Sequence, residues 1–125
     1  MAQVLPLDSC EVVAVDPDKV ALARESTPGL DEAAALAQLF KLLGDPTRTR
    51  ILYALLGAGE LCVCDLAAVV GVPETTVSQA LRLLRTAGAV DNRRAGRMVF
   101  YRLADAHVRM LLDLSREHTR HDGAR

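Results

Sequence analysis

The sequence is poor in aromatic residues, with 2 Tyr, 2 Phe and no Trp among 125 residues, although 50% of the chain is hydrophobic. A core built from Leu, Val and Ala favours helices over sheets. No apolar run reaches the ~18 residues of a membrane span. The start, MAQVLPLDSC, lacks the basic and apolar regions of a secretory signal. We therefore expect one cytoplasmic domain with reduced thiols, no disulfides and no membrane partner.

The net charge is also small, at −1, but the charges are unevenly distributed. Residues 1–32 hold seven acidic residues against two basic ones, whereas residues 74–100 hold five arginines against two acidic residues. Such asymmetry indicates a focused surface for a polyanion, although an ordinary solvated face explains the charge alone equally well.

Turn and cap signals predict a mainly helical chain. A short helix is expected after Asp16-Pro17, and a second one is capped by Asp31 and stopped by Gly44. A third helix starts at Asp45-Pro46 and is stopped by Gly57.

Two further helices are joined by the short turn GVP. In the second, ETTVSQALRLLRTAG, the residues Val77, Leu81 and Leu84 share one face and should be buried. Five polar side chains are left outside, and they are our candidate DNA contacts: Thr75, Thr76, Ser78, Gln79 and Arg82. This pattern is typical of a helix-turn-helix.

Two strand-like runs follow, around Ala95-Gly96. A basic hairpin directly after a helix-turn-helix is the layout of a winged helix, whose helix enters the major groove of DNA. We expect phosphate contacts from the arginines of this wing, Arg93, Arg94 and Arg97.

The three histidines of the chain all fall in a predicted last helix. His118 and His121 are neighbours on one face, but His107 lies ~16 Å away along the axis and cannot share their ion within one chain. If two copies of the helix pack antiparallel, Asp105 and His107 of one copy meet His118 and His121 of the other. That set suits Zn²⁺ or Co²⁺, while the alternative is a polar, solvent-facing stripe.

Two of the 3 cysteines lie one residue apart in ELCVCDL, and three uses compete for them. They could be buried packing residues, a redox pair, or part of a metal site. The C-x-C spacing disfavours a disulfide. Together with Cys10, Cys62 and Cys64 would form a thiolate site that selects soft ions such as Cd²⁺, Pb²⁺, Bi³⁺ or As(III).

Residues 31–121 resemble the ArsR/SmtB family of metal-responsive winged-helix repressors. The resemblance is carried by LGDPTRTRILYAL, ELCVCDLA, VSQALRLLRTAGAV, RRAGRMVFYRL and the closing DAH with its two later histidines. The opening DSCEVVAVDPDKV is similar to the arm of the cadmium- and lead-sensing CadC branch.

This resemblance implies a homodimer with an N-terminal arm over residues 1–30 and a winged helix-turn-helix over residues 31–125. The apo dimer would bind operator DNA and leave it when metal binds. Cd²⁺ or Pb²⁺ would occupy the thiolate site, with Cys10 from the partner subunit. Zn²⁺ or Co²⁺ would occupy the site of Asp105, His107, His118 and His121.

The chain departs from the family pattern at three alanines. Ala14 replaces a second arm cysteine, so the thiolate site is left with three sulfurs or is completed by an oxygen, for example from Asp8, Glu11 or Glu60. Ala67 stands where arsenic sensors have a third cysteine. Ala80 stands where the family commonly has a histidine, and we expect this difference to alter base readout or coupling.

The function predicted from these features is a metal-responsive repressor of metal-efflux or resistance genes, and not an enzyme. An arsenite-responsive repressor of the same fold is one alternative, and a metal buffer without DNA function is another. A zinc hydrolase is disfavoured because the fourth ligand closes the metal shell.

Overall fold

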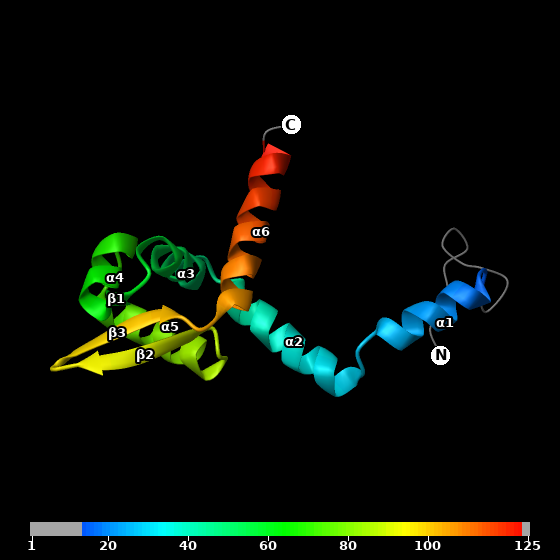
Figure 1. The fold of residues 1–125 in the computed structure, drawn as a ribbon, viewed down its shortest axis with the longest axis horizontal. Helices are drawn as coiled ribbons and strands as arrows, with labels where there is room; N and C mark the ends of the chain where they lie inside the picture. The colour runs from blue at the N-terminus through cyan, green and yellow to red at the C-terminus, as the bar shows by residue number, and fades with distance from the viewer. Residues whose placement is uncertain (1–13, 124–125) are drawn as a thin grey trace. The chain divides into compact units, whose positions relative to one another are not determined.

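The protein is mainly helical with one small antiparallel sheet (Figure 1). The computed structural model describes residues 14–123, with side chains as far as residue 120. The elements, in chain order, are α1 (Pro17–Ser26), α2 (Leu30–Leu43), α3 (Pro46–Ala58), β1 (Leu61–Cys62), α4 (Val63–Val70), α5 (Glu74–Thr86), β2 (Val90–Ala95), β3 (Met98–Leu103) and α6 (Ala106–Gly123). Within this part of the chain, no helix is long and apolar enough to cross a membrane.

The chain divides into two units between Ala35 and Leu36. The first unit contains α1, which begins as predicted: Asp16 caps it by accepting a hydrogen bond from the backbone N–H of Lys19 at 3.1 Å. The second unit contains every element from the C-terminal half of α2 onward.

Capping interactions hold the junction between the end of α2 and the start of α3. As predicted, Asp45 caps α3 by accepting from the N–H of Arg48 at 3.0 Å, and Pro46 follows at the first helical position. Side chains from the first turn of α3 also bond to the last carbonyls of α2: Arg48 Nε lies 2.7 Å from Leu42 O, and Thr49 Oγ1 lies 2.7 Å from Leu43 O.

Two predicted boundaries are wrong. Asp31 does not cap α2, because the helix already begins at Leu30 and Asp31 lies in its first turn, where the helix dipole favours an acid. Gly57 does not stop α3 either. The helix continues to Ala58 and ends at Gly59, whose φ of 88° is a conformation that favours glycine.

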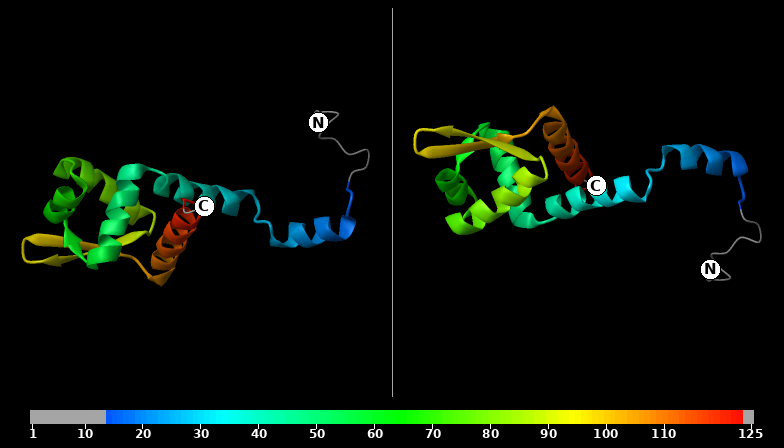
Figure 2. Two further views of the ribbon diagram at one scale, coloured as in Figure 1. Left: turned by 90° about the horizontal axis from the view of Figure 1, so that it is seen from above. Right: turned by 90° about the horizontal axis from the view of Figure 1, so that it is seen from below.

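The core lies between α3, α4, α5 and the sheet, which gather together in both views of Figure 2. The predicted inner face of α5 is confirmed, since Val77, Leu81 and Leu84 are all 0% exposed. The other fully buried large side chains come from neighbouring elements: Ile51, Leu52, Leu55, Leu66 and Val90.

The predicted hairpin is confirmed, with β2 and β3 paired from Val90 opposite Leu103 to Ala95 opposite Met98. The sequence pattern did not predict β1, which pairs antiparallel with β3 and places Cys62 opposite Phe100. The sheet therefore has three strands in the order β1-β3-β2, and the hairpin is joined to the segment that carries the cysteines.

Helix α6 begins after Asp105, which accepts a hydrogen bond from the N–H of Val108 at 3.0 Å. The hydroxyl of Tyr53 donates to Leu112 O at 2.6 Å and so ties α3 to α6. The apolar face of α6 is only partly buried: Leu112 is buried and Val108 is half-buried, but Leu111 is exposed, as is Ser115.

We expect Leu81→Ala to lower the free energy of unfolding by about 2–5 kcal/mol, because the change leaves a cavity in a fully packed core. Leu83→Ala, at a 49% exposed position two residues away, is the matched control and should cost far less. Urea denaturation followed by circular dichroism measures both variants. Equal losses would mean that the inner face of α5 is assigned wrongly.

Candidate DNA-binding and metal-binding sites

The turn between α4 and α5 sets the direction of the second helix. Helix α4 ends at Gly71, which has a φ of 70° in the left-handed region. Pro73 then occupies the N-cap position of α5 in an extended conformation. Only Val72 separates these two residues, so the two helices are held close together, as in a helix-turn-helix.

The outer face of α5 is polar and exposed, as predicted. All five candidate contact residues lie on it: Thr75, Thr76, Ser78, Gln79 and Arg82. Ala80, by contrast, is 6% exposed and belongs to the core, so its side chain does not lie on this outer face.

A polar cleft of about 390 Å³ lies between α5 and β3. Ser78 and Arg82 line it together with Arg85, Thr86 and Tyr101. Arg85 and Tyr101 were not among the predicted contacts. Arg85 could have been predicted from the sequence, because it follows Arg82 at i+3 and so lies near it on the same helix. Tyr101 could not, because a residue of β3 comes to this cleft only through the tertiary fold.

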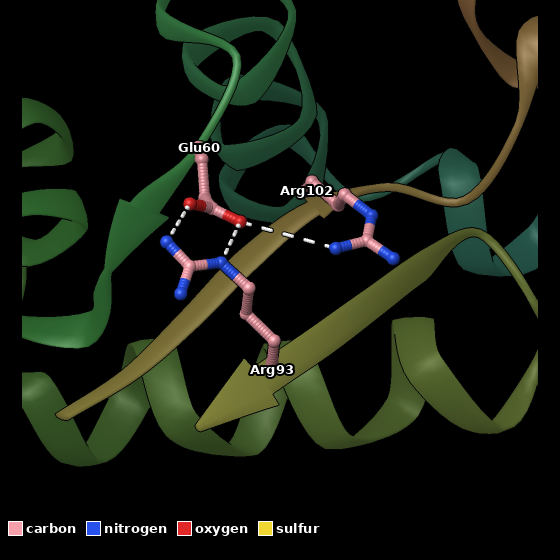
Figure 3. A network of polar contacts seen from close by, with 3 residues as sticks. All are labelled: Glu60, Arg93 and Arg102. Atoms are coloured by element: carbon pink, nitrogen blue, oxygen red, sulfur yellow. Dashed lines mark hydrogen bonds and ion pairs between the residues drawn. The ribbon is translucent and has the colours of Figure 1, made fainter. Parts of the chain in front are cut away.

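The wing arginines have different surroundings. Arg93 holds Glu60 through two hydrogen bonds, Nε to Oε2 at 2.8 Å and Nη2 to Oε1 at 2.6 Å (Figure 3). Its guanidinium also lies over the ring of Phe100, 5.0 Å from the centroid. Arg102 approaches the same carboxylate at 3.9 Å. The hydrogen bonds from Arg93 hold the pKa of the Glu60 carboxyl below its ordinary value.

Arg93 is therefore engaged with Glu60, which immediately precedes β1. Arg94 and Arg97, at the hairpin end, are exposed and have no ion-pair partner among residues 14–120. Of the three arginines predicted to meet phosphate, Arg94 and Arg97 are therefore the two that are not held by a carboxylate of the described residues.

The two neighbouring cysteines have different environments because the chain changes from strand to helix between them. Cys62 ends β1 at the N-cap position of α4 and is 5% exposed, whereas Cys64 lies in the first turn of α4 and is exposed. Both are free thiols. The third predicted thiolate, Cys10, lies outside the described residues.

Glu74, the first residue of α5, lies beside Cys64, with 3.7 Å between Sγ and Oε2. The negative charge of Glu74 raises the pKa of the Cys64 thiol, and partial burial adds to this effect. The Cys64 thiol donates a weak hydrogen bond to this carboxylate.

The start of α6 brings together half of the second predicted metal site. Nδ1 of His107 lies 3.7 Å from Oδ1 of Asp105, and the N–H of Val108 lowers the pKa of that carboxyl. His118 lies farther along α6 with an exposed side chain. The side chain of His121 falls outside the described part of the chain.

Within residues 14–120, no three His, Cys, Asp or Glu side chains form a group able to hold a metal ion. The donor chemistry still fits a thiophilic ion, because Cys62 and Cys64 are reduced and Cys64 faces solvent beside a carboxylate. Either predicted site would therefore need a further donor from the arm or from a second copy of the chain.

An apolar surface covers parts of α2 and α6. Its large exposed side chains are Leu36, Phe40, Met110, Leu111 and Leu114. Beside it, an apolar hollow of about 210 Å³ is lined by residues that include Phe40, Tyr53 and Leu111. Exposed large apolar side chains beside such a hollow are typical of an interaction surface.

The chain is similar to metal-resistance regulators over most of its length. It is 39% identical over 113 residues to the cadmium resistance transcriptional regulatory protein CadC homolog of Staphylococcus aureus, covering 90% of this chain and 93% of that protein. It is 44% identical over 99 residues to the transcriptional repressor SmtB homolog of Synechocystis sp., covering 79% and 74%. The crystal structure of the AntR antimony-specific transcriptional repressor matches with a TM-score of 0.70 at 30% identity, covering 91% of this chain and 100% of that one.

A helix-turn-helix with a polar outer face, followed by a β-hairpin, defines a winged-helix DNA-binding regulator. Residues 45–92 match the family model of bacterial regulatory proteins of the arsR family. Together with the similarity to CadC and SmtB homologues, this match shows that the chain belongs to the ArsR/SmtB family. It is a transcriptional repressor of that type and not an enzyme, which confirms the resemblance drawn from the sequence.

Proposed function

We propose that this chain is a metal-responsive repressor that binds operator DNA as a cytoplasmic apo dimer and releases it when a metal ion binds. The observation that carries the proposal is the position of Cys62 and Cys64 at the first turn of α4, the first helix of the helix-turn-helix. An ion held there acts directly on the helix pair that reads DNA. The regulated genes would be those of metal efflux or resistance, as the name of the CadC homologue indicates for that protein.

The DNA surface that we propose combines α5 with the wing. The outer face of α5 supplies candidate contacts to base edges in the major groove, and the cleft lined by Arg82 and Arg85 fits a phosphate group by its charge. Arg94 and Arg97 would meet phosphates on the flanking backbone. Arg93 would instead hold the wing in position through Glu60.

Arg82→Ala should weaken operator binding and reduce the slope of log affinity against log salt concentration by about 1, because one phosphate contact and its released counterion are lost. Arg109→Ala removes an equally charged, exposed residue from α6 and should leave the slope unchanged. Fluorescence anisotropy of labelled operator DNA at several salt concentrations measures both. An unchanged slope for Arg82→Ala would remove this residue from the interface.

Dimerisation would bury the apolar surface of α2 and α6. Phe40 and Leu114 are each 60% exposed on it, which is costly for large apolar side chains in an isolated protomer. If the two α6 helices pack antiparallel, Asp105 and His107 of one subunit lie beside His118 and His121 of the other. This arrangement would complete the predicted Zn²⁺ or Co²⁺ site.

Leu114→Glu should convert the dimer to a monomer, because it places a charge in the centre of the proposed apolar interface. Val69→Glu makes the same type of change at a 54% exposed position on α4 and should leave the dimer intact. Analytical ultracentrifugation at micromolar protein concentration distinguishes the two. A dimeric Leu114→Glu protein would place the interface elsewhere.

For the thiolate site we propose Cd²⁺ or Pb²⁺ as the inducing ion, with Cys62 and Cys64 as ligands and Cys10 as the third. A trivalent metalloid such as As(III) is the second candidate, favoured by the similarity to the antimony-specific repressor AntR. Ala67, at the position where arsenic sensors have another cysteine, weighs against this candidate.

We expect Cd²⁺ or Pb²⁺ to release the wild-type protein from its own upstream DNA under reducing conditions, and Cys64→Ser to abolish the release. Cys64 is the better position to change, because its side chain is exposed and outside the core, so apo operator binding should survive. Anisotropy titrations with Cd²⁺, Pb²⁺, As(III) and Zn²⁺ measure the effect, with His118→Ala as the parallel variant.

Release of Cys64→Ser by Zn²⁺, combined with loss of release in His118→Ala, would transfer control to the histidine site. A protein that binds metal but no DNA would be a buffer and not a repressor. Release by As(III) alone would favour the metalloid sensor.

A further inference from the structure

Glu60 lies between two arginines that come from different strands of the wing hairpin (Figure 3). It directly precedes β1, whereas Arg93 belongs to β2 and Arg102 to β3. Arg93 donates to both carboxylate oxygens, at 2.8 and 2.6 Å, and Arg102 approaches Oε2 at 3.9 Å. Since β3 lies between β1 and β2 in the sheet, Glu60 and Arg93 meet across the central strand. One carboxylate thus contacts both strands of the hairpin.

The strand register explains how these side chains come together. Phe100 on β3 is paired with Arg93 on one side and with Cys62 on the other, so these three side chains share one face of the sheet. Arg102 follows Phe100 by two residues and shares that face. The guanidinium of Arg93 lies over the Phe100 ring, 5.0 Å from its centroid. Arg93 is therefore held by two contacts, the ring of Phe100 and the carboxylate of Glu60.

The contact with Glu60 distinguishes Arg93 from the other wing arginines. Arg94 and Arg97 have no ion-pair partner among residues 14–120. An exposed ion pair contributes little to stability, but two parallel hydrogen bonds fix the direction of an arginine side chain. The main physical effect of the Glu60 contact is therefore on the position and the effective charge of Arg93, rather than on folding.

A phosphate and a carboxylate compete for the same planar fork of an arginine. A DNA phosphate could bind the fork of Arg93 only if both hydrogen bonds to Glu60 were given up. We propose that Glu60 keeps Arg93 away from the DNA backbone and so limits the attraction of the wing for DNA of any sequence. This inference rests on the proposed operator binding and adds to it a residue that affects DNA binding without touching DNA.

Such a contact would favour the operator over other DNA. Non-specific binding comes almost entirely from phosphate contacts, whereas operator binding also uses base contacts, which we assign to the outer face of α5. On unrelated DNA, the protein can shift along the duplex until a freed Arg93 meets a phosphate. On the operator, the base contacts of α5 fix the register. Loss of the Glu60 charge should therefore raise non-specific affinity more than operator affinity, which makes Glu60 a specificity-determining residue.

Asp91 provides a matched control, because it is the acidic residue of the hairpin itself. It lies on β2 two residues before Arg93 and is paired with Arg102 across the strands. In the part of the chain that the structure describes, it forms no ion pair. Asp91→Asn therefore removes the same charge from the same hairpin without freeing an arginine.

The test uses the full-length protein under reducing conditions without added metal, and compares wild type, Glu60→Gln, Arg93→Gln, the double variant and Asp91→Asn. Fluorescence anisotropy gives the affinity for a labelled duplex of the protein's own upstream DNA and for an unrelated duplex of equal length. Both are measured from about 50 to about 200 mM salt, the range over which phosphate contacts change affinity strongly. Circular dichroism verifies that each variant retains its helices.

On unrelated DNA, we expect Glu60→Gln to steepen the slope of log affinity against log salt by about 0.9, because one more arginine releases a counterion. That slope corresponds to about fivefold tighter non-specific binding at about 0.15 M salt. The ratio of operator affinity to non-specific affinity should fall. Arg93→Gln alone should leave the slope unchanged, but it should abolish the increase when combined with Glu60→Gln. Asp91→Asn should behave like wild type.

A lower slope for Arg93→Gln alone would overturn the inference, because Arg93 would then already contact phosphate in the wild-type protein. An increase in Glu60→Gln that persists in the double variant would also overturn it, as would an equal increase in Asp91→Asn, since the effect would then be general charge. Absence of binding to either duplex by the wild-type protein would instead overturn the proposed repressor function itself.

Discussion

The burial of one face of α5 is the constraint on which the rest of the structure depends. Val77, Leu81 and Leu84 are all fully buried, and they fix the rotation of the helix about its axis. Once that rotation is set, the polar residues between them have to face outward. The same packing places α5 against α4 and against β2, and the start of α5 lies beside Cys64. The polar outer face of α5 and the surroundings of Cys64 are therefore two results of one hydrophobic contact.

The parts of the fold with a local cause could be predicted from the sequence. Asp45 followed by Pro46 marks the start of a helix, because the capping side chain of the first and the restricted φ angle of the second are properties of those residues alone. In the same way, the spacing of the apolar residues of α5 identifies the face that is buried in the core. Gly57 was wrongly predicted as the end of α3. A glycine within a helix costs only about 1 kcal/mol, and the packing of the helix in the folded protein can offset that cost. Strand β1 had no local signal, because two residues pair only when β3 is already in place.

For the candidate sites, too, only the features with a local cause could be predicted from the sequence. The identity of the donors, two thiols and a set of histidines, was visible as residue types at particular spacings. Their surroundings were not, because the nearness of Glu74 to Cys64 and of Glu60 to Arg93 spans 10 and 33 residues of sequence. Contacts between elements depend on the turn at Gly71 and on the strand register, which no periodicity encodes. The assignment of Arg93 to a structural ion pair is a result of that kind.

The change from strand to helix between Cys62 and Cys64 has a consequence for how this sequence can vary over evolutionary time. The buried position, 62, is constrained by packing whether or not an ion is bound, so a small apolar residue could persist there after the sensing function was lost. The exposed position, 64, contributes no core packing, and only its chemistry would preserve a cysteine there. If the proposed thiolate site fell out of use, position 64 would therefore be expected to lose its cysteine earlier than position 62.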